Sequence, residues 1–411
     1  MQAISMPRPG SLDYNHADID LEALKGNFGT MQAFAGKRPL MAVVKGDAYG
    51  HGLVECARAL VEAGARLLGV LDAREGVALR QAGIGRAEIC VLAGITSELQ
   101  IAAAVRNDLT PFVYSREQLL SLAAAASKET RRIKAFLKID TGMNRLGVPW
   151  NMAEDFLTMA AGSPHLEVTG LATHLATLGD AAATVQLTRF WDVCAGAEEI
   201  FRKPLANSAL SGGGMLAHPD YPDGISRPGL ALYGAVAGLS PGPPPPRLPR
   251  PWAPDLPTPP PPLEAREPSL PEASVRCAEL LVPVMRVTSR VVQVKTVRRG
   301  EAVSYGGTWR AERDTRAAVL PIGYVHGLQT SRSGRCAALI RGSIAPQIGR
   351  VCMNLSVYDA AAIPSVQPGD EAVLLGAQGD AFLGPCGAPG EDLSPYETLC
   401  LLGRLNVRRY M

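Results

Sequence analysis

The sequence lacks the features that mark several large classes of protein. No run approaches the about 20 apolar residues of a membrane span, and residues 1–16 have no apolar signal-peptide core. Its 8 cysteines occur singly, without a C-x-x-C pair to indicate a zinc site or disulfide framework. A net charge of +2, without a basic stripe, argues against nucleic acid as partner. We expect a cytoplasmic protein without a metal site that binds a small molecule.

The chain divides by composition at a proline-rich stretch. With 411 residues, 47% of them hydrophobic, it is long enough for two domains, or three. Residues 241–271 hold too much proline for a helix or a central strand, which predicts a polyproline-like linker; a ligand for an SH3-type domain is the alternative. The expected divisions are a tail (1–16), a first domain (17–236), a proline-rich insertion (237–279) and a second domain (280–411).

Short, continuous apolar runs alternate with helical patterns before the linker. Such runs are typical of parallel strands buried on both faces, and eight of them in about 230 residues predict a (β/α)₈ barrel. A doubly wound sheet is the rival, but no G-x-G-x-x-G follows the first run. After the linker, valine-rich stretches between Gly and Pro turns predict an antiparallel β-domain. The runs are 40–44, 66–71, 88–94, 111–114, 133–139, 167–173, 204–207 and 230–234.

Polar residues stand at or near the ends of these predicted strands. The carboxyl ends of barrel strands converge on one mouth, so we expect the side chains there to lie close together. Each of these residues, taken alone, has a simpler structural interpretation. A lysine at the end of a strand is often a surface residue, and a single histidine is often a hydrogen-bonded side chain that fills space in the protein. The residues are Lys45, Lys138, Asp140, His174, Asn207, Ser208 and Arg227.

Eight motifs together resemble one family. They are AVVKGDAYGHG, LKIDTGMNRLG, GLATHLAT, ANSAL, SRPGLALYG, VSYGGTW, IGRVCMNLSVYD and SPYETLC, in the order and approximate spacing of the alanine racemases. The resemblance covers about residues 17–235 and 280–410. It implies an isomerase that uses pyridoxal 5′-phosphate (PLP), interconverts L- and D-alanine, supplies D-alanine for peptidoglycan, and works as a homodimer with shared active sites.

The resemblance also assigns cofactor residues. Lys45 resembles the lysine that holds PLP as a Schiff base, and lysine suits this role because a desolvated amine loses its proton readily. Arg227 resembles the arginine at the pyridine nitrogen, where a fixed cation favours reprotonation at Cα over transamination. Hydroxyl and N–H groups suit the phosphate. The residues expected around it are Tyr49, Ser208, Gly229, Leu230 and Tyr396.

Racemisation needs a proton-transferring group on each face of the substrate. The resemblance implies Lys45 on one face and Tyr305 of the neighbouring subunit on the other, with His174 and Arg227 in a chain to that tyrosine. Two further residues would meet the substrate carboxylate: Arg145, and Met353 through its backbone N–H from the second subunit. Lys138 occupies a position that is often carbamylated, so that modification or a bound anion is expected beside Arg145.

Two departures from the family pattern concern the entrance to the neighbouring site. His326 stands in GYVHG where aspartate is usual, and Asn354 follows CM where aspartate is the commoner residue; Tyr324 is kept. A racemase of serine or a larger amino acid, or a decarboxylase of the same fold, is therefore the alternative function. A PLP-binding protein without turnover is a further one, which the second domain with VSYGG disfavours.

Overall fold

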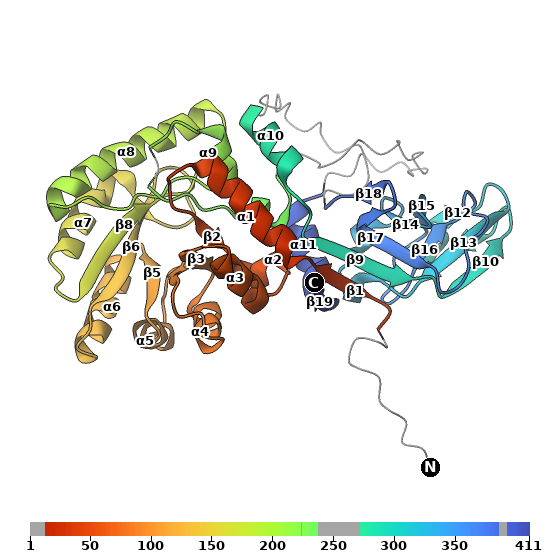
Figure 1. Ribbon diagram of the computed structural model, residues 1–411, viewed down its shortest axis with the longest axis horizontal. Coiled ribbons are helices and arrows are strands. Elements are labelled where there is room, and N and C mark those ends of the chain that lie inside the picture. Colours follow the sequence, from red (N-terminus) through yellow and green to blue (C-terminus); the bar gives the residue numbers. More distant parts are fainter. Residues whose placement is uncertain (1–12, 223, 237–271, 386–392) are drawn as a thin grey trace, which may run out of the picture.

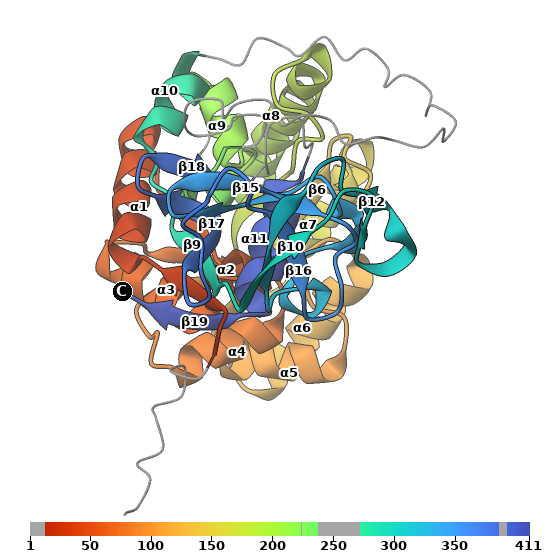
Figure 2. The same cartoon turned by 90° about the vertical axis from the view of Figure 1, so that its right-hand side faces the viewer.

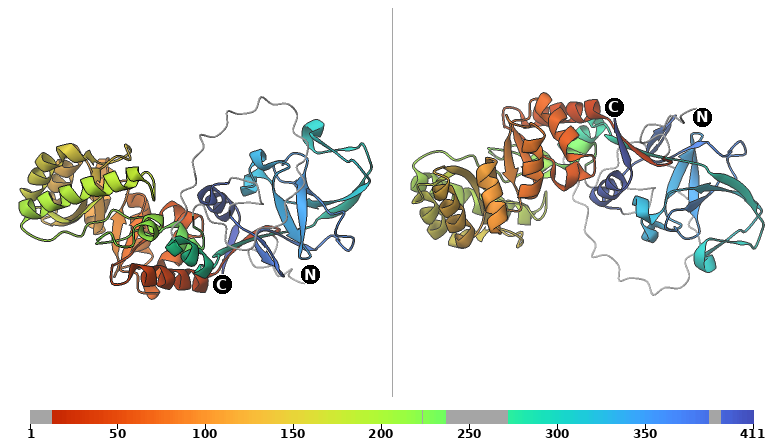
Figure 3. Two further views of the ribbon diagram at one scale, coloured as in Figure 1. Left: turned by 90° about the horizontal axis from the view of Figure 1, so that it is seen from above. Right: turned by 90° about the horizontal axis from the view of Figure 1, so that it is seen from below.

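The computed structural model describes residues 13–222, 224–236, 272–385 and 393–411. Two domains lie side by side, one of alternating strands and helices and one mainly of strands (Figures 1 and 3). The predicted linker 241–271 falls outside the described residues. Across the described ranges, no helix combines the length and the apolar character that crossing a membrane requires.

The first domain begins with helix α1 (Leu21–Ala35) and continues with parallel strands separated by helices. Several helices start at a side chain that caps a free N–H; Asp20, Asp72 and Ser115 do so for α1, α4 and α6. The strands are β2 (Met41–Val43), β3 (Leu67–Val70), β4 (Glu88–Val91), β5 (Leu109–Val113), β6 (Ile133–Asp140), β7 (Val148–Pro149) and β8 (Leu166–Ala172). The helices are α2 (Lys45–Tyr49), α3 (Leu53–Glu62), α4 (Ala73–Gln81), α5 (Glu98–Arg106), α6 (Arg116–Lys128), α7 (Ala153–Ala161), α8 (Ala181–Phe201) and α9 (Gly212–Ala217).

Isolated bridges complete this sheet as a barrel. Ser208 pairs with Ala172 of β8, and Arg227 pairs with Ser211. The segment around Ser226 then returns to the first strand, where the N–H of Met41 donates to the Ser226 carbonyl at 2.9 Å. Because all these pairings are parallel, the predicted (β/α)₈ barrel is confirmed.

The prediction of the eighth barrel strand at 230–234 was wrong. Leu230–Tyr233 form a 3₁₀ helix, η2, which ends at Gly234 in the left-handed conformation with φ 84°. The eighth position in the barrel is taken by the residues just before it. Pro228 has no N–H to donate but gives its carbonyl to the N–H of Val43 at 3.0 Å. Likewise, 204–207 form no regular strand and reach the sheet through the bridge at Ser208.

The second domain is the predicted antiparallel β-domain. Its main sheet runs β10-β13-β16-β15-β14-β17-β9-β1-β19, and Figure 2 shows this domain in front of the barrel. The strands are β9 (Met285–Arg290), β10 (Gln293–Val297), β11 (Ala302–Val303), β12 (Trp309–Arg310), β13 (Thr315–Leu320), β14 (Ala337–Ile340), β15 (Ser343–Ile348), β16 (Ser356–Asp359), β17 (Glu371–Gln378), β18 (Ala381–Leu383) and β19 (Val407–Tyr410).

Several segments tie the domains together. Strand β1 (His16–Ile19), which precedes the barrel, pairs with β9 and β19 in the second sheet. Helix α10 (Glu272–Leu280), at the end of the expected insertion, packs against α1 and α9. Helix α11 (Pro395–Arg404) packs against α2, so the second domain touches the barrel beside Lys45.

Candidate active site

The segment after strand β2 forms one left-handed turn. Gly46, Asp47, Ala48 and Tyr49 all have φ between 53° and 68°. For non-glycine residues this conformation costs about 1–2 kcal/mol each, so the turn stores roughly 3–6 kcal/mol over three residues. Strain of this size is concentrated at functional sites. It places the Lys45 side chain at the start of the turn and Tyr49 at its end.

A cavity of about 790 Å³ opens at the carboxyl ends of the barrel strands. This size suits a small-molecule cofactor together with a small substrate. Most of the residues predicted for the site line this cavity, although they come from distant parts of the sequence. They are Lys45, Tyr49, Lys138, Arg145, His174, Arg227, Gly229, Leu230 and Tyr396.

The cavity concentrates cationic groups. Burial, and then the charges of Arg145 and Arg227, lower the pKa of Lys45 below its ordinary value. Burial and the same two guanidinium groups lower the pKa of Lys138 well below normal. Burial, followed by the Arg227 charge, lowers the pKa of His174 to about 2, so its imidazole is neutral. Such a cavity favours anions and shifts both amines toward the neutral form.

Arg227 is held in a network of its own. Its guanidinium donates to the carbonyls of Ser208 and Thr173, both at 2.7 Å, and lies 3.4 Å from Nδ1 of His174. The Ser208 hydroxyl accepts from Arg227 and donates to the Ile225 carbonyl at 2.5 Å. Ser208 is fully buried and is not among the residues that line the cavity. In this structure its hydroxyl supports Arg227 rather than facing the cavity.

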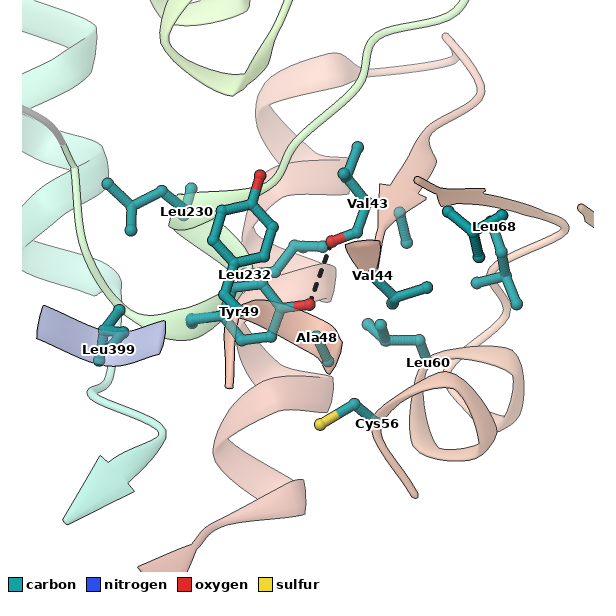
Figure 4. Close-up of a cluster of buried hydrophobic side chains, with 14 of the residues drawn as sticks. Val43, Val44, Ala48, Tyr49, Cys56, Leu60, Leu68, Leu230, Leu232 and Leu399 are labelled. Atoms are coloured by element: carbon teal, nitrogen blue, oxygen red, sulfur yellow. Dashed lines mark hydrogen bonds between the residues drawn. The ribbon is translucent and has the colours of Figure 1, made fainter. Parts of the chain in front are cut away.

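Tyr49, Tyr396 and Gly229 line another part of the cavity, with Tyr233 packed behind Tyr49. The rings of Tyr49 and Tyr233 lie 4.9 Å apart, and those of Tyr49 and Tyr396 lie 6.0 Å apart. Figure 4 shows Tyr49 beside Leu230, and its dashed line marks the 3.0 Å bond from the Tyr233 hydroxyl to the Val43 carbonyl. A Cβ on Gly229 would overlap the Tyr49 hydroxyl, so any other residue there would require the Tyr49 ring to move.

Tyr305 and Met353 lie outside this cavity. Tyr305 begins η3 (Tyr305–Gly307) and is 71% exposed, and Met353 is 54% exposed. Strand β12, which follows η3, lies in the second domain away from the barrel (Figure 1). Ser304, directly before Tyr305, has φ 65° and ψ −174°, and its hydroxyl donates to the Arg350 carbonyl at 2.6 Å. The expected second base is thus presented on the surface by a strained turn.

The two departures lie near that surface. His326 ends η4 (Tyr324–His326), and its Nδ1 accepts from the Gly323 N–H at 3.2 Å, so it caps its own turn. Asn354 is exposed next to Met353. The N–H of Tyr324 donates to the Cys352 carbonyl at 3.1 Å, which brings η4 against the 352–354 loop.

Other residues that build the site were not predicted from the sequence. Ser211, Gly212 and Gly213 line the cavity, and the glycine run SGGG was an available signal for close backbone approach. The Glu75 carboxylate holds the left-handed turn by accepting hydrogen bonds from two of the turn's backbone N–H groups. Its sequence context, the third helical position after an aspartate N-cap, predicts only a helix start.

This barrel, with a desolvated lysine in a cationic cavity at its mouth, belongs to the class of enzymes that bind an anionic ligand beside a reactive amine. Residues 19–237 match the family model described as alanine racemase, N-terminal domain, and residues 284–410 match the one described as alanine racemase, C-terminal domain. The chain belongs to the alanine racemase family.

Individual relatives are similar to this protein over nearly the whole length of the chain. The alanine racemase of Syntrophobacter fumaroxidans is 34% identical over 407 residues, which cover 97% of each protein. The crystal structure of alanine racemase from D-cycloserine producing Streptomyces lavendulae is 30% identical, covers 97% of each chain and has a TM-score of 0.82. The alanine racemase from Bartonella henselae with covalently bound pyridoxal phosphate shares the fold, with 22% identity, a TM-score of 0.79, and coverage of 97% of this chain and 100% of that one.

The family is PLP-dependent, and the residues of this site fit the cofactor. Arg145 and Arg227 suit its anionic substituents, burial lowers the pKa of the Lys45 amine that would hold it, and Gly229, which has no Cβ, leaves room for the Tyr49 hydroxyl.

Proposed function

We propose that this chain interconverts L- and D-alanine with Lys45 and the partner subunit's Tyr305 as the two proton-transferring groups. The observation that carries the proposal is the lowered pKa of Lys45 in a cavity at the barrel mouth, because a base must be unprotonated to accept the Cα proton. PLP, when bound, acidifies the Cα proton of the amino acid by withdrawing electron density. Lys45 would hold the cofactor and, once released by substrate, take or give that proton on one face.

The remaining residues orient the ligands. Tyr49, Tyr396 and the backbone at Gly229 and Leu230 would hold the cofactor phosphate, on the wall where they lie together. Arg227 would face the pyridine nitrogen, where its fixed positive charge would disfavour protonation of that nitrogen; the carbonyl oxygens of Ser208 and Thr173 hold its guanidinium in place.

Arg145 would bind the substrate carboxylate, with Lys138 modified beside it. Lys138 is buried next to Arg145 and Arg227, and its lowered pKa favours the neutral amine. A neutral amine can add to carbon dioxide: the nitrogen lone pair forms a bond to carbon and one proton leaves, which gives a carbamate anion. The anion would pair with Arg145 and offset the repulsion between the Arg145 and Arg227 guanidinium groups.

A homodimer would complete the site. Tyr305, Met353 and Tyr324 are exposed in the second domain, and neither Tyr305 nor Met353 lines the cavity of its own chain. An isologous dimer would carry the Tyr305 loop of each subunit into the partner's barrel mouth, where the Met353 N–H would meet the substrate carboxylate.

A mixed-dimer experiment tests the shared site. Lys45→Ala and Tyr305→Phe should each abolish most turnover of L-alanine in deuterated water, measured as Cα exchange with inversion. After the two variants are mixed and reassembled, half of the dimers hold one intact site, so about a quarter of wild-type activity should return. If activity stays at the level of the parents, the bases do not come from different subunits. Carbon dioxide release from any amino acid would instead indicate a decarboxylase.

We further propose a cytoplasmic enzyme that supplies D-alanine for peptidoglycan. The family assignment supports both statements. Expression of the chain should allow a bacterium that requires added D-alanine to grow without it, and the Tyr305→Phe variant should not. Growth supported equally by both proteins would refute the link between this site and D-alanine supply.

A further inference from the structure

The left-handed turn behind Lys45 leaves backbone groups that its own hydrogen bonds do not satisfy. Within the turn, the N–H of Ala48 donates to the Val44 carbonyl at 2.8 Å, and the N–H of Gly50 donates to the Asp47 carbonyl at 3.0 Å. The first two N–H groups, those of Gly46 and Asp47, have no acceptor within the turn, as at the start of any helix.

The Glu75 carboxylate accepts both of these N–H groups. Its Oε1 lies 2.9 Å from the Gly46 nitrogen and 3.1 Å from the Asp47 nitrogen. Its Oε2 accepts from the Leu71 N–H at 2.7 Å. The side chain is 8% exposed, so these three bonds form where water competes little. A carboxylate that receives three backbone N–H groups is a strong and directional anchor.

Glu75 is itself fixed by the helix that carries it. It stands near the start of α4, where its N–H donates to the Asp72 N-cap at 3.0 Å. The carboxylate therefore joins the loop after β3 to the loop after β2, and its position is set by a strand and a helix rather than by the turn.

The far end of the turn has a second anchor. His51 is fully buried, and its Nδ1 lies 2.9 Å from the Ala48 carbonyl and 3.2 Å from the Tyr49 carbonyl. The ring stacks on Tyr233 with centroids 4.5 Å apart. An acceptor thus holds the N–H end of the turn and a donor holds its carbonyl end.

The geometry points to Glu75 as a positioning residue: by capping the strained left-handed turn, it fixes the backbone from which the Lys45 amine reaches the cofactor and the substrate Cα. This inference rests on the proposed function of Lys45. Glu75 does not line the cavity, so it acts through the turn and through its charge. The groups that act electrostatically on Lys45 are Arg145 and Arg227, which lower its pKa, and Glu75 and the Cys400 thiol, which raise it.

Glu75→Gln and Glu75→Ala test this role in the holoenzyme, with Glu98→Gln as control. Glu98 is exposed in the first turn of α5. Glutamine has a single acceptor oxygen and so places an amide nitrogen against at least one N–H, whereas alanine removes all three bonds. In Glu75→Gln, hydrogen exchange should accelerate about tenfold at whichever of residues 46, 47 and 71 faces the amide nitrogen, and in Glu75→Ala it should accelerate at all three. The control should exchange as wild type does.

Two readouts separate positioning from general stability. In Glu75→Gln, kcat for L-alanine should fall about tenfold or more while KM changes less than about threefold, because a misplaced base affects proton transfer more than binding. The absorbance of the lysine-bound cofactor should also change at a lower pH, because an anion near the amine has been removed.

The inference is overturned if Glu75→Ala exchanges at residues 46 and 47 at the wild-type rate, or if exchange accelerates equally in residues 285–297 of the second domain. A failure of the proposed function looks different: wild-type protein would then show no turnover of L-alanine. The exchange comparison would still decide whether Glu75 holds the turn.

Discussion

Acid should destabilise this protein through His51. The side chain is fully buried, and burial lowers its pKa from 6.5 to about 4. Above pH 6.5 neither the folded nor the unfolded state binds the proton. Between pH 6.5 and 4 the unfolded chain takes it up and the folded protein does not, so stability falls as the pH falls. At about 1.4 kcal/mol for each pKa unit, the loss reaches about 3 kcal/mol at pH 4.

His51→Asn removes this titration and keeps a donor near Nδ1. The free energy of unfolding should be measured for both proteins from pH 8 to pH 4. Above pH 7 the difference between them reports the lost stacking on Tyr233, and wild type should be the more stable. Toward pH 4 wild type should lose about 3 kcal/mol more than the variant. Parallel curves would refute the reasoning, because a neutral buried imidazole cannot be removed without changing the pH dependence.

Three further substitutions probe other parts of the site. Gly229→Ala should push the Tyr49 ring aside and weaken PLP binding by about 1–3 kcal/mol, measured by cofactor titration. Arg408→Gln breaks the ion pair with Asp47; because both side chains are about a quarter exposed, the loss of unfolding free energy should be about 1 kcal/mol and should shrink at high salt. Ser304→Ala removes the hydrogen bond that fixes the turn before the proposed second base, so kcat should fall about tenfold while PLP affinity stays unchanged. A drop in PLP affinity instead would contradict that role.

Sequence patterns were sufficient for the barrel and for the group of residues at its mouth. Continuous apolar runs report burial on both faces, and strand ends in a parallel barrel face the same way, so Lys45, Lys138, His174 and Arg227 were expected together. The structure places them around one cavity. The apolar run at 230–234 led to the wrong prediction of a strand because hydrophobicity indicates burial and not the pattern of backbone hydrogen bonds. Those residues are buried in a 3₁₀ helix instead of a strand.

The left-handed turn could not be predicted in this way. Ala48 and Tyr49 have no local preference for positive φ, and the turn is held by Glu75, 29 residues after Gly46. A conformation that depends on a distant partner leaves no periodic signal in the sequence. The roles assigned to Tyr305 and Met353 came from the family resemblance alone, because a residue that acts in another subunit has no partner within its own chain.

The pairing of β1 with β19 also governs when the second domain can be completed during synthesis. Asp18 lies on β1, and Arg409, 391 residues later, holds its carboxylate through two bonds at 2.5 and 2.8 Å. Residues 407–410 are synthesised after all the other strands of this sheet, so β1 gains its partner on this side only at that stage. The barrel, encoded between β1 and β9, has all its strands earlier. A chain that stops before residue 407 would carry a formed barrel and an unpaired strand edge open to aggregation.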